Sequence, residues 1–200
     1  MKRFFLVPVS LFLLLALAAT AASAQWRLNA EASSIDFVTI KKSKVAELNT
    51  FGVLEGEIGE DGKASISIEL ASVETRIPIR NERMQKLLFE VDRFPLAVIT
   101  ATVDTDRLHG MAPGDSFVTS SRLTLSLHGE TQPLDADLRV VKLADERLLI
   151  TTVRPVIVNA DAFSLGAGVE KLREVAKLPS ISTAVPVTVD LVFEHRKQPR

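Results

Sequence analysis

The side chains that could support acid–base or metal chemistry are few and scattered along this chain. There are three histidines, His109, His128 and His195, and no cysteine. No two of the histidines have a zinc-ligand spacing such as HExxH or HxH. Each lies beside an expected turn or near the chain end, which favours a surface or loop position over a ligand or a base. We therefore expect no metal site.

Paired carboxylates also fail to form a recognisable catalytic pattern. Asp104/Asp106 and Asp135/Asp137 have the spacing of one strand face, which a solvated polar face explains. A glycosidase would need its two acids on opposite sides of a cleft. The chain contains no nucleophile elbow, phosphate-binding glycine loop or dinucleotide-binding fingerprint. These residues give no positive evidence for catalysis and we expect no cofactor, so an enzyme with an unrecognised site is the least favoured interpretation.

The N-terminus predicts export. Lys2 and Arg3 precede an apolar run from Phe4 to Thr20, and Ala22-Ser23-Ala24 supplies the small residues of a signal-peptidase site. Residues 1–24 are thus predicted to be a cleavable signal peptide, with one domain over 25–200 and no membrane span after cleavage. A retained anchor is disfavoured because Pro8 interrupts a run already marginal for the ~20 residues of a span.

Cysteine content and net charge restrict the compartment and the classes of partner that we expect. A cysteine-free exported domain must be stabilised by its core, which suits the bacterial periplasm better than extracellular disulfide modules. The formal net charge is −1, and acidic and basic residues are interspersed. We therefore expect no nucleic-acid partner.

Period-two alternation of apolar and polar residues dominates the rest of the chain. Successive side chains of a strand point to opposite faces, so such rows predict strands with one apolar face. The apolar rows are Ala64/Ile66/Ile68/Leu70, Leu123/Leu125/Leu127, Leu134/Ala136/Leu138/Val140 and Val185/Val187/Val189/Leu191/Phe193.

Turn signals and two helical segments separate these rows. Residues 59–62 predict a hairpin between strands near 51–58 and 63–70, and residues 145–146 join strands near 134–143 and 147–158. Apolar residues at helical spacing predict one short helix over 81–89, with Asn81 as N-cap, and a second over 168–178. Ordinary core packing of both apolar stripes is favoured over a partner-binding face.

Short strands with short links predict an all-β sandwich or up-and-down barrel. A small barrel is either filled by its own side chains or keeps room for one apolar ligand. The residues alone favour the filled core.

Four segments resemble the YceI-like family. Ser72–Arg76 and Arg80–Arg83 are similar to its S-[VI]-[DE]-T-R-N-x-x-R stretch, and Phe89–Pro95 to the following F-x-x-x-x-[FY]-P. The segment Leu123–Leu134 resembles its L-T-[IL]-x-G-x-T-[KR]-P-[VL] signature, and Ser33–Phe37 its opening strand. The motifs occur in the family's order along residues 25–200.

The resemblance implies an antiparallel eight-stranded lipocalin-like barrel, covered by one or two short helices, in the periplasm. It further implies an apolar lumen that binds a polyisoprenoid, such as a prenyl quinone or a prenyl pyrophosphate, for carriage or sequestration. The lumen candidates are Phe37, Phe51, Leu88, Phe89, Phe94 and Phe117, and the candidates for head-group contact are Arg76, Arg80 and Arg83.

Departures from the family pattern lie near the expected barrel mouth. Ile77-Pro78-Ile79 lengthens the loop into the first helix, and Lys41-Lys42 stands where many members carry a histidine. The alternative function is a non-lipid envelope interaction or stress-related module with a filled core, contacting its partner through loops or the 168–178 helix. Both interpretations allow a homodimer.

Overall fold

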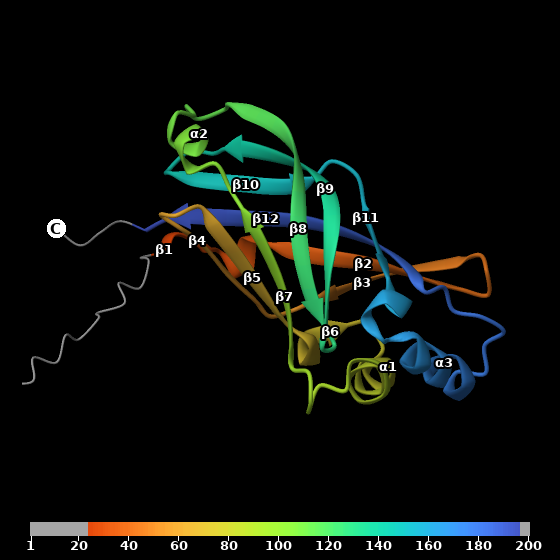
Figure 1. The fold of residues 1–200 in the computed structure, drawn as a ribbon. Helices are drawn as coiled ribbons and strands as arrows, with labels where there is room; N and C mark the ends of the chain where they lie inside the picture. Colours follow the sequence, from red (N-terminus) through yellow and green to blue (C-terminus); the bar gives the residue numbers. More distant parts are fainter. Residues whose placement is uncertain (1–23, 197–200) are drawn as a thin grey trace, which may run out of the picture.

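The computed structural model describes residues 24–196, which form a closed β-barrel with short helices at its ends (Figure 1). The expected signal peptide, residues 1–24, lies outside the described part except for Ala24, the first residue of β1. Within 24–196, no helix has the length and hydropathy needed to cross a bilayer.

Twelve strands form the barrel wall. They are β1 Ala24–Leu28, β2 Ser34–Lys41, β3 Val45–Phe51, β4 Leu54–Gly59, β5 Lys63–Glu69, β6 Val73–Glu74, β7 Leu96–Thr102, β8 Ser116–Leu127, β9 Glu130–Lys142, β10 Arg147–Thr152, β11 Val156–Asn159 and β12 Ala184–His195.

The twelve segments make eight long antiparallel strands, because four of the long strands are each interrupted once. On one edge of β12 lie β1 and β2, and on its other edge lie β10 and β11. The next long strand is β3 with β4, followed by β5 with β6. Pairing of β1 with β12, which sets Trp26 opposite His195, closes the ring. The predicted all-β, eight-stranded antiparallel barrel is confirmed.

The apolar rows of the sequence form the inner face of this barrel. Ile68 of β5, Leu125 of β8 and Leu191 of β12 are 5%, 6% and 3% exposed. Thr100 of β7, one residue away from an inward position, is exposed. Each of the four predicted rows therefore lies on the buried face of its strand.

One end of the barrel is filled. Trp26 of β1 and Leu148 of β10 are fully buried there, together with Leu108 of the short helix α2, Thr105–His109. Helix α2 lies over this end (Figure 1), and the Asp104 side chain caps it by accepting a hydrogen bond of 3.0 Å from the Arg107 amide. The sequence pattern did not predict this helix, because a five-residue segment is too short to show helical periodicity.

The other end is covered by helices. Helix α1, Pro78–Arg83, continues directly into the π-helix η3, Met84–Phe89, and α3, Gly166–Val175, packs against η3 (Figure 1). The short 3₁₀ turns are η1 Ala30–Ala32, η2 Leu70–Ser72 and η4 Ala160–Phe163.

The expected N-cap of the first helix is wrong. The helix begins at Pro78, where a missing amide hydrogen is harmless in a first turn. Asn81 lies inside the helix, and its Oδ1 accepts hydrogen bonds from the Thr75 amide at 2.9 Å and the Thr75 hydroxyl at 2.6 Å. Asn81 thus ties the helix to the preceding loop. The second helix begins and ends two or three residues before the expected 168–178.

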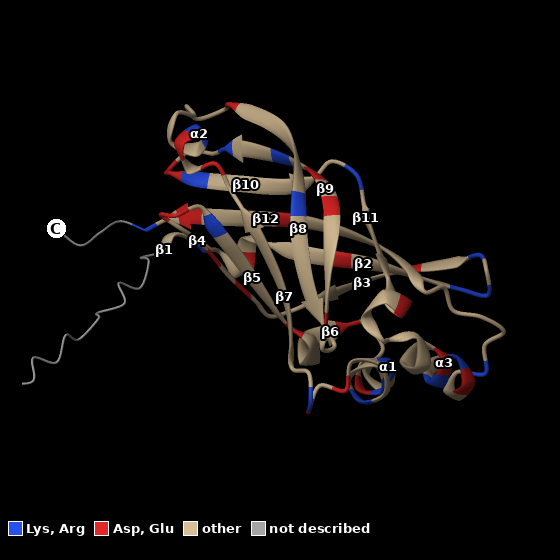
Figure 2. Ribbon diagram, viewed as in Figure 1, with Lys and Arg blue, Asp and Glu red and all other residues tan. Residues whose placement is uncertain are grey.

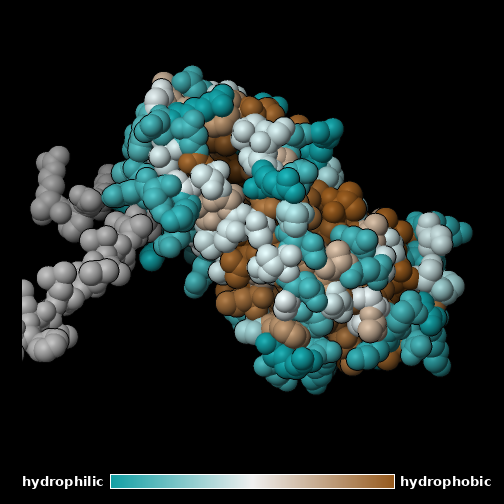
Figure 3. All heavy atoms as spheres, in the orientation of Figure 1, coloured by the Kyte–Doolittle hydropathy of each residue, from teal (hydrophilic) through white to brown (hydrophobic). Residues whose placement is uncertain are grey.

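The barrel wall is looser between β9 and β11. Among the described strands β11 pairs with β12 alone, and the last ladder contact to β9 is the Val153 amide donating to the Asp137 carbonyl at 2.8 Å. The Arg154–Asp137 ion pair bridges the same point. Ile157 is 56% exposed on the outside, and Figure 3 shows hydrophobic surface in the region of β11 on an otherwise mixed face.

Candidate ligand-binding cavity

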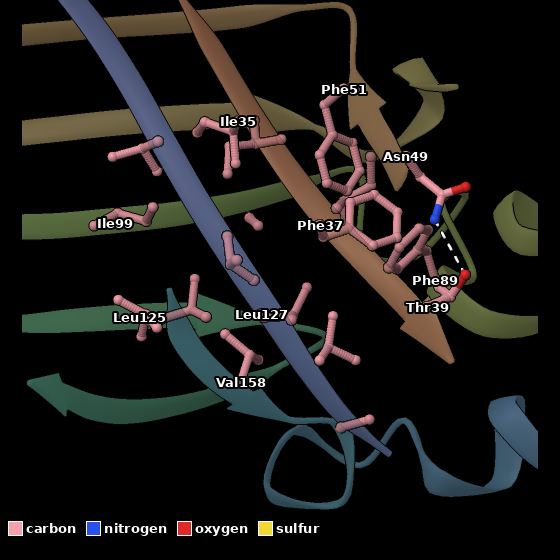
Figure 4. Close-up of a pocket in the computed structure, with 18 of the residues that line it drawn as sticks. Ile35, Phe37, Thr39, Asn49, Phe51, Phe89, Ile99, Leu125, Leu127 and Val158 are labelled. Atoms are coloured by element: carbon pink, nitrogen blue, oxygen red, sulfur yellow. Dashed lines mark hydrogen bonds between the residues drawn. The ribbon is translucent and has the colours of Figure 1, made fainter. Parts of the chain in front are cut away.

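A cavity of about 510 Å³ occupies the barrel between its filled end and the helices. This volume falls within the ~300–1,000 Å³ of typical small-molecule sites. Aliphatic side chains from the inner faces of the strands form most of its wall, among them Ile35, Ile99, Leu125 and Val158 (Figure 4). The filled core favoured by the residues alone is therefore wrong, because side-chain volume does not fill the ring that eight tilted strands enclose.

An aromatic cluster lies at the helical side of the cavity. The rings of Phe37 and Phe51 lie 5.2 Å apart, and those of Phe51 and Phe89 lie 6.0 Å apart (Figure 4). Leu88, beside Phe89 on η3, also lines the cavity. The structure thus brings together four of the six predicted lumen residues.

The other two predicted lumen residues, Phe94 and Phe117, lie outside the cavity lining. Phe94 follows η3 and packs on His128 of the β8–β9 turn, with ring centroids 4.4 Å apart. Phe117 is on the inward row of β8, but at the filled end, where the Arg107 guanidinium lies 3.6 Å from its ring centroid. Residue type and strand face cannot show how far along the barrel a cavity extends.

Charged side chains meet at the helical end of the cavity. Lys41 Nζ donates to Glu47 Oε1 at 2.8 Å, and Arg80 Nη1 donates to Glu47 Oε2 at 2.8 Å. The three side chains are 25%, 30% and 25% exposed. The Lys41 ammonium and the Arg80 guanidinium hold the pKa of Glu47 below its ordinary value, against the opposing effect of burial.

The predicted head-group arginines separate into two groups. Arg80 and Arg83 of α1 line the cavity. Arg76 is exposed and does not line it, and its backbone is in the left-handed region at φ 62°, where its amide donates to the Glu74 carboxylate. The Ile77–Ile79 insertion places two side chains on the cavity wall, Ile77 just before α1 and Ile79 in its first turn.

Asn49 lies between the aromatic cluster and the charged end. It is 3% exposed, and its Nδ2 donates to Thr39 Oγ1 at 3.2 Å (Figure 4) and to the Glu47 carbonyl at 3.1 Å. Its Oδ1 has no partner among residues 24–196. Asn49 therefore fixes the backbone of β3 beside Glu47 at the point where the wall changes from apolar to charged.

Helix α3 closes the cavity from outside the barrel. Val169 and Leu172 line the cavity, whereas Val175 is 46% exposed. The apolar stripe predicted for this helix is thus largely used in packing, and Leu172 is not free to contact a partner.

None of the three histidines lines the cavity. His109 is exposed, His128 packs on Phe94, and His195 makes an edge contact with Trp26 at 4.9 Å between ring centroids. Within residues 24–196, no group of three His, Asp or Glu side chains is arranged to hold a metal ion.

Comparison with known proteins agrees with this architecture. The model of the YceI-like domain matches residues 26–193. This chain belongs to the YceI-like family. A polyisoprenoid binding domain from Saccharophagus degradans, implicated in plant cell wall breakdown, is 38% identical, with a TM-score of 0.85 over 87% of this chain and 100% of that one.

More distant YceI-like structures share the fold. BcnA from Burkholderia cenocepacia is 16% identical, with a TM-score of 0.65 over 82% of this chain and 98% of its own. The YceI protein of Campylobacter jejuni is 16% identical, with a TM-score of 0.51 over 75% of this chain and 85% of its own. No curated protein matches the chain.

Large aromatic residues make up only a small part of the lining of this YceI-like barrel. Aliphatic side chains of the four period-two rows supply much of the wall, and those rows are visible in the sequence. Lys41 and Glu47 were also missed as cavity residues. Their positions, in step with Phe37 and Phe51 on strands β2 and β3, are the signal that could have found them.

Proposed function

We propose that this protein binds one long apolar chain of the isoprenoid type in its barrel cavity and carries or sequesters it in the periplasm. The observation that supports the proposal most directly is the cavity of about 510 Å³ with an almost wholly aliphatic and aromatic wall. The polyisoprenoid binding domain of Saccharophagus degradans, which has the same fold at 38% identity, gives independent support.

The physical basis is hydrophobic transfer. Burying each methylene-sized unit contributes about 0.8 kcal/mol, so a long tail binds tightly without directional contacts. Isoprenoid tails are almost insoluble in water, and a carrier between two membranes must shield them completely. The signal-peptide pattern of residues 1–24 supports a location in the periplasm.

A filled interaction module is not favoured, because the cavity contradicts its filled core and Leu172 of α3 is occupied by packing. A purely binding role, without catalysis, fits a wall that holds no histidine and a single carboxylate within the described residues.

Direct recovery of the ligand tests the proposal. The full-length precursor should be expressed in a Gram-negative host, and the protein released from the periplasm and purified without detergent. Organic extraction followed by mass spectrometry should yield a prenyl lipid at close to one molecule per protein. Protein that is lipid-free, and that takes up no added prenyl lipid, would contradict the proposal.

A further inference from the structure

The cavity opens to solvent beside the helices that cover it. Ile77 and Ile79, at the start of α1, line the cavity and are also exposed. Ala176, which follows α3 directly, likewise lines the cavity and is exposed. Side chains that face both the cavity and the solvent mark an entrance. The rim of this entrance is therefore apolar.

The β2–β3 turn and the segment after α3 lie side by side at the entrance. Lys41, the last residue of β2, lines the cavity. The Lys42 amide donates to the Ser180 carbonyl at 3.0 Å, and the Ser182 amide donates to the Ile40 carbonyl at 2.8 Å. Because both hydrogen bonds join backbone to backbone, they hold the two segments together whatever side chains they carry. The two segments therefore belong to one surface.

Basic and apolar side chains adjoin one another on this surface. Lys42 and Lys44 of the turn and Lys177 after α3 are exposed, and none of the three forms an ion pair with a described carboxylate. Val45, next to Lys44, is exposed as well. Together with the two isoleucines of the rim, these residues make up the entrance surface, namely Lys42, Lys44, Val45, Ile77, Ile79 and Lys177.

Charge is distributed unevenly along the barrel. The three segments at the entrance, 41–47, 76–86 and 170–177, hold ten basic and four acidic residues, whereas the whole chain holds 24 and 25. Figure 2 shows basic residues at the β2–β3 turn and on α1, and several acidic residues at the opposite end near α2. A molecule polarised in this way approaches a negatively charged surface with its entrance first.

We propose that the entrance surface docks on an anionic phospholipid bilayer, and that the apolar chain passes between the bilayer and the cavity there. The ammonium groups of Lys42, Lys44 and Lys177 contact lipid phosphates. The side chains of Ile77 and Ile79 enter the boundary between head groups and acyl chains. Lysines without a counter-charge beside exposed apolar side chains are the composition with which peripheral proteins bind anionic membranes.

A bilayer fits this surface better than a second copy of the chain does. A symmetric dimer through the entrance surface would place the same lysines opposite one another, and like charges that face each other destabilise an interface. A bilayer offers phosphates to the lysines and hydrocarbon to the isoleucines. The inference rests on the proposed function for the passage of the apolar chain, whereas docking itself is measured without a bound ligand.

Vesicle binding tests the docking. The purified protein is mixed with vesicles of phosphatidylcholine alone, or of phosphatidylcholine and phosphatidylglycerol in equal parts, and the bound fraction is measured by flotation. We expect the anionic vesicles to bind at least about tenfold more tightly, and added salt to reduce the difference. Equal affinity for the two kinds of vesicle would overturn the docking.

Matched charge variants locate the surface. Lys42→Gln/Lys177→Gln should bind anionic vesicles about 25-fold more weakly, because each lysine near such a surface contributes a factor of about five. The control Arg27→Gln/Arg139→Gln removes the same charge from exposed positions on β1 and β9 and should bind nearly as the wild type does. Thermal unfolding curves show whether both variants fold. Equal weakening in the two variants would contradict the assignment, since net charge alone would then explain it.

Lipid transfer tests the passage. Transfer of a prenyl quinone from vesicles to delipidated protein should be faster from the anionic vesicles, and Lys42→Gln/Lys177→Gln should slow it to the rate seen with phosphatidylcholine alone. Affinity for farnesol in solution should be the same in this variant as in the wild type, because neither lysine lines the cavity. A transfer rate that does not depend on vesicle charge would overturn the passage.

The results separate docking from the proposed function. Uptake of farnesol from solution without any preference for anionic vesicles would overturn the docking and leave the lipid-binding function intact. Vesicle binding without uptake of either prenyl lipid would overturn the proposed function and, with it, the passage. Self-association that is lost in Lys42→Gln/Lys177→Gln would assign the entrance surface to a second copy of the chain and would overturn the docking.

Discussion

Gly168 of α3 lies so close to the π-helix η3 that a β-carbon added at this position would be 2.8 Å from the Leu87 carbonyl oxygen. The same β-carbon would be 2.9 Å from the Leu88 Cα. Both contacts are with backbone atoms, which cannot be relieved by a change of rotamer as a contact with a flexible side chain can. The two helices that close the cavity therefore approach each other in a way that only glycine permits.

Gly168→Ala should separate α3 from η3. We expect a loss of about 1–3 kcal/mol in the free energy of unfolding, as for other overpacked sites, and faster release of bound lipid. Urea denaturation and a lipid-transfer assay measure the two effects. Gly110→Ala is the control, because the nearest atom to its β-carbon is at 3.6 Å, an ordinary contact. Equal unfolding free energies and equal lipid-release rates in the two variants would show that the close approach of α3 to η3 does not control closure of the cavity.

Trp26 should be the main stabilising residue of the filled end. Its side chain is fully buried, and the Lys142 ammonium lies 4.9 Å from its ring centroid. Trp26→Ala should cost about 3–5 kcal/mol in the free energy of unfolding. Circular dichroism during urea denaturation measures it, since the chain has one tryptophan and loses its fluorescence in the variant. Val118→Ala, at a 47% exposed position, should cost less than about 0.5 kcal/mol.

Glu47 should make stability depend on pH. Its pKa is lowered in the folded protein by Lys41 and Arg80, so its contribution is present above the unfolded glutamate pKa of about 4.3 and is lost as pH falls through the lower folded value. Because the group is partly solvated, the contribution is less than about 1 kcal/mol. Wild type and Glu47→Gln should differ in unfolding free energy at neutral pH and converge below about pH 4. A difference that stays constant with pH would contradict this role.

The period-two rows explain why so much of the fold could be predicted. Alternation in Val185–Phe193 or Leu123–Leu127 predicts which face of the strand is buried. Every such row does face the inside of the barrel. The resemblance to the YceI-like family then predicts that there are eight long strands. The interruptions that divide four strands, and the helix at 105–109, leave no periodic signal because they are too short.

The site was predicted less well, for two physical reasons. Phe117 faces inward as its row requires, yet it lies beyond the cavity, since the position of a void along the barrel depends on how the ends are packed. Glu47 looks like an ordinary surface charge in the sequence, and Lys41 stands out there only as a departure from the family pattern near the expected mouth. Only the helical cover, α1, brings Arg80 to Glu47 across 33 residues of chain and turns them into a cavity mouth.

The central claim is that an apolar chain occupies this cavity, and native mass spectrometry of a matched pair of variants tests it most directly. Ala101 of β7 lines the cavity, and its neighbour Thr100 points outward. Delipidated wild type and Thr100→Phe should each take up one molecule of a prenyl lipid, whereas Ala101→Phe, which fills the cavity, should take up little or none while remaining folded. Equal uptake by Ala101→Phe and Thr100→Phe would contradict the account.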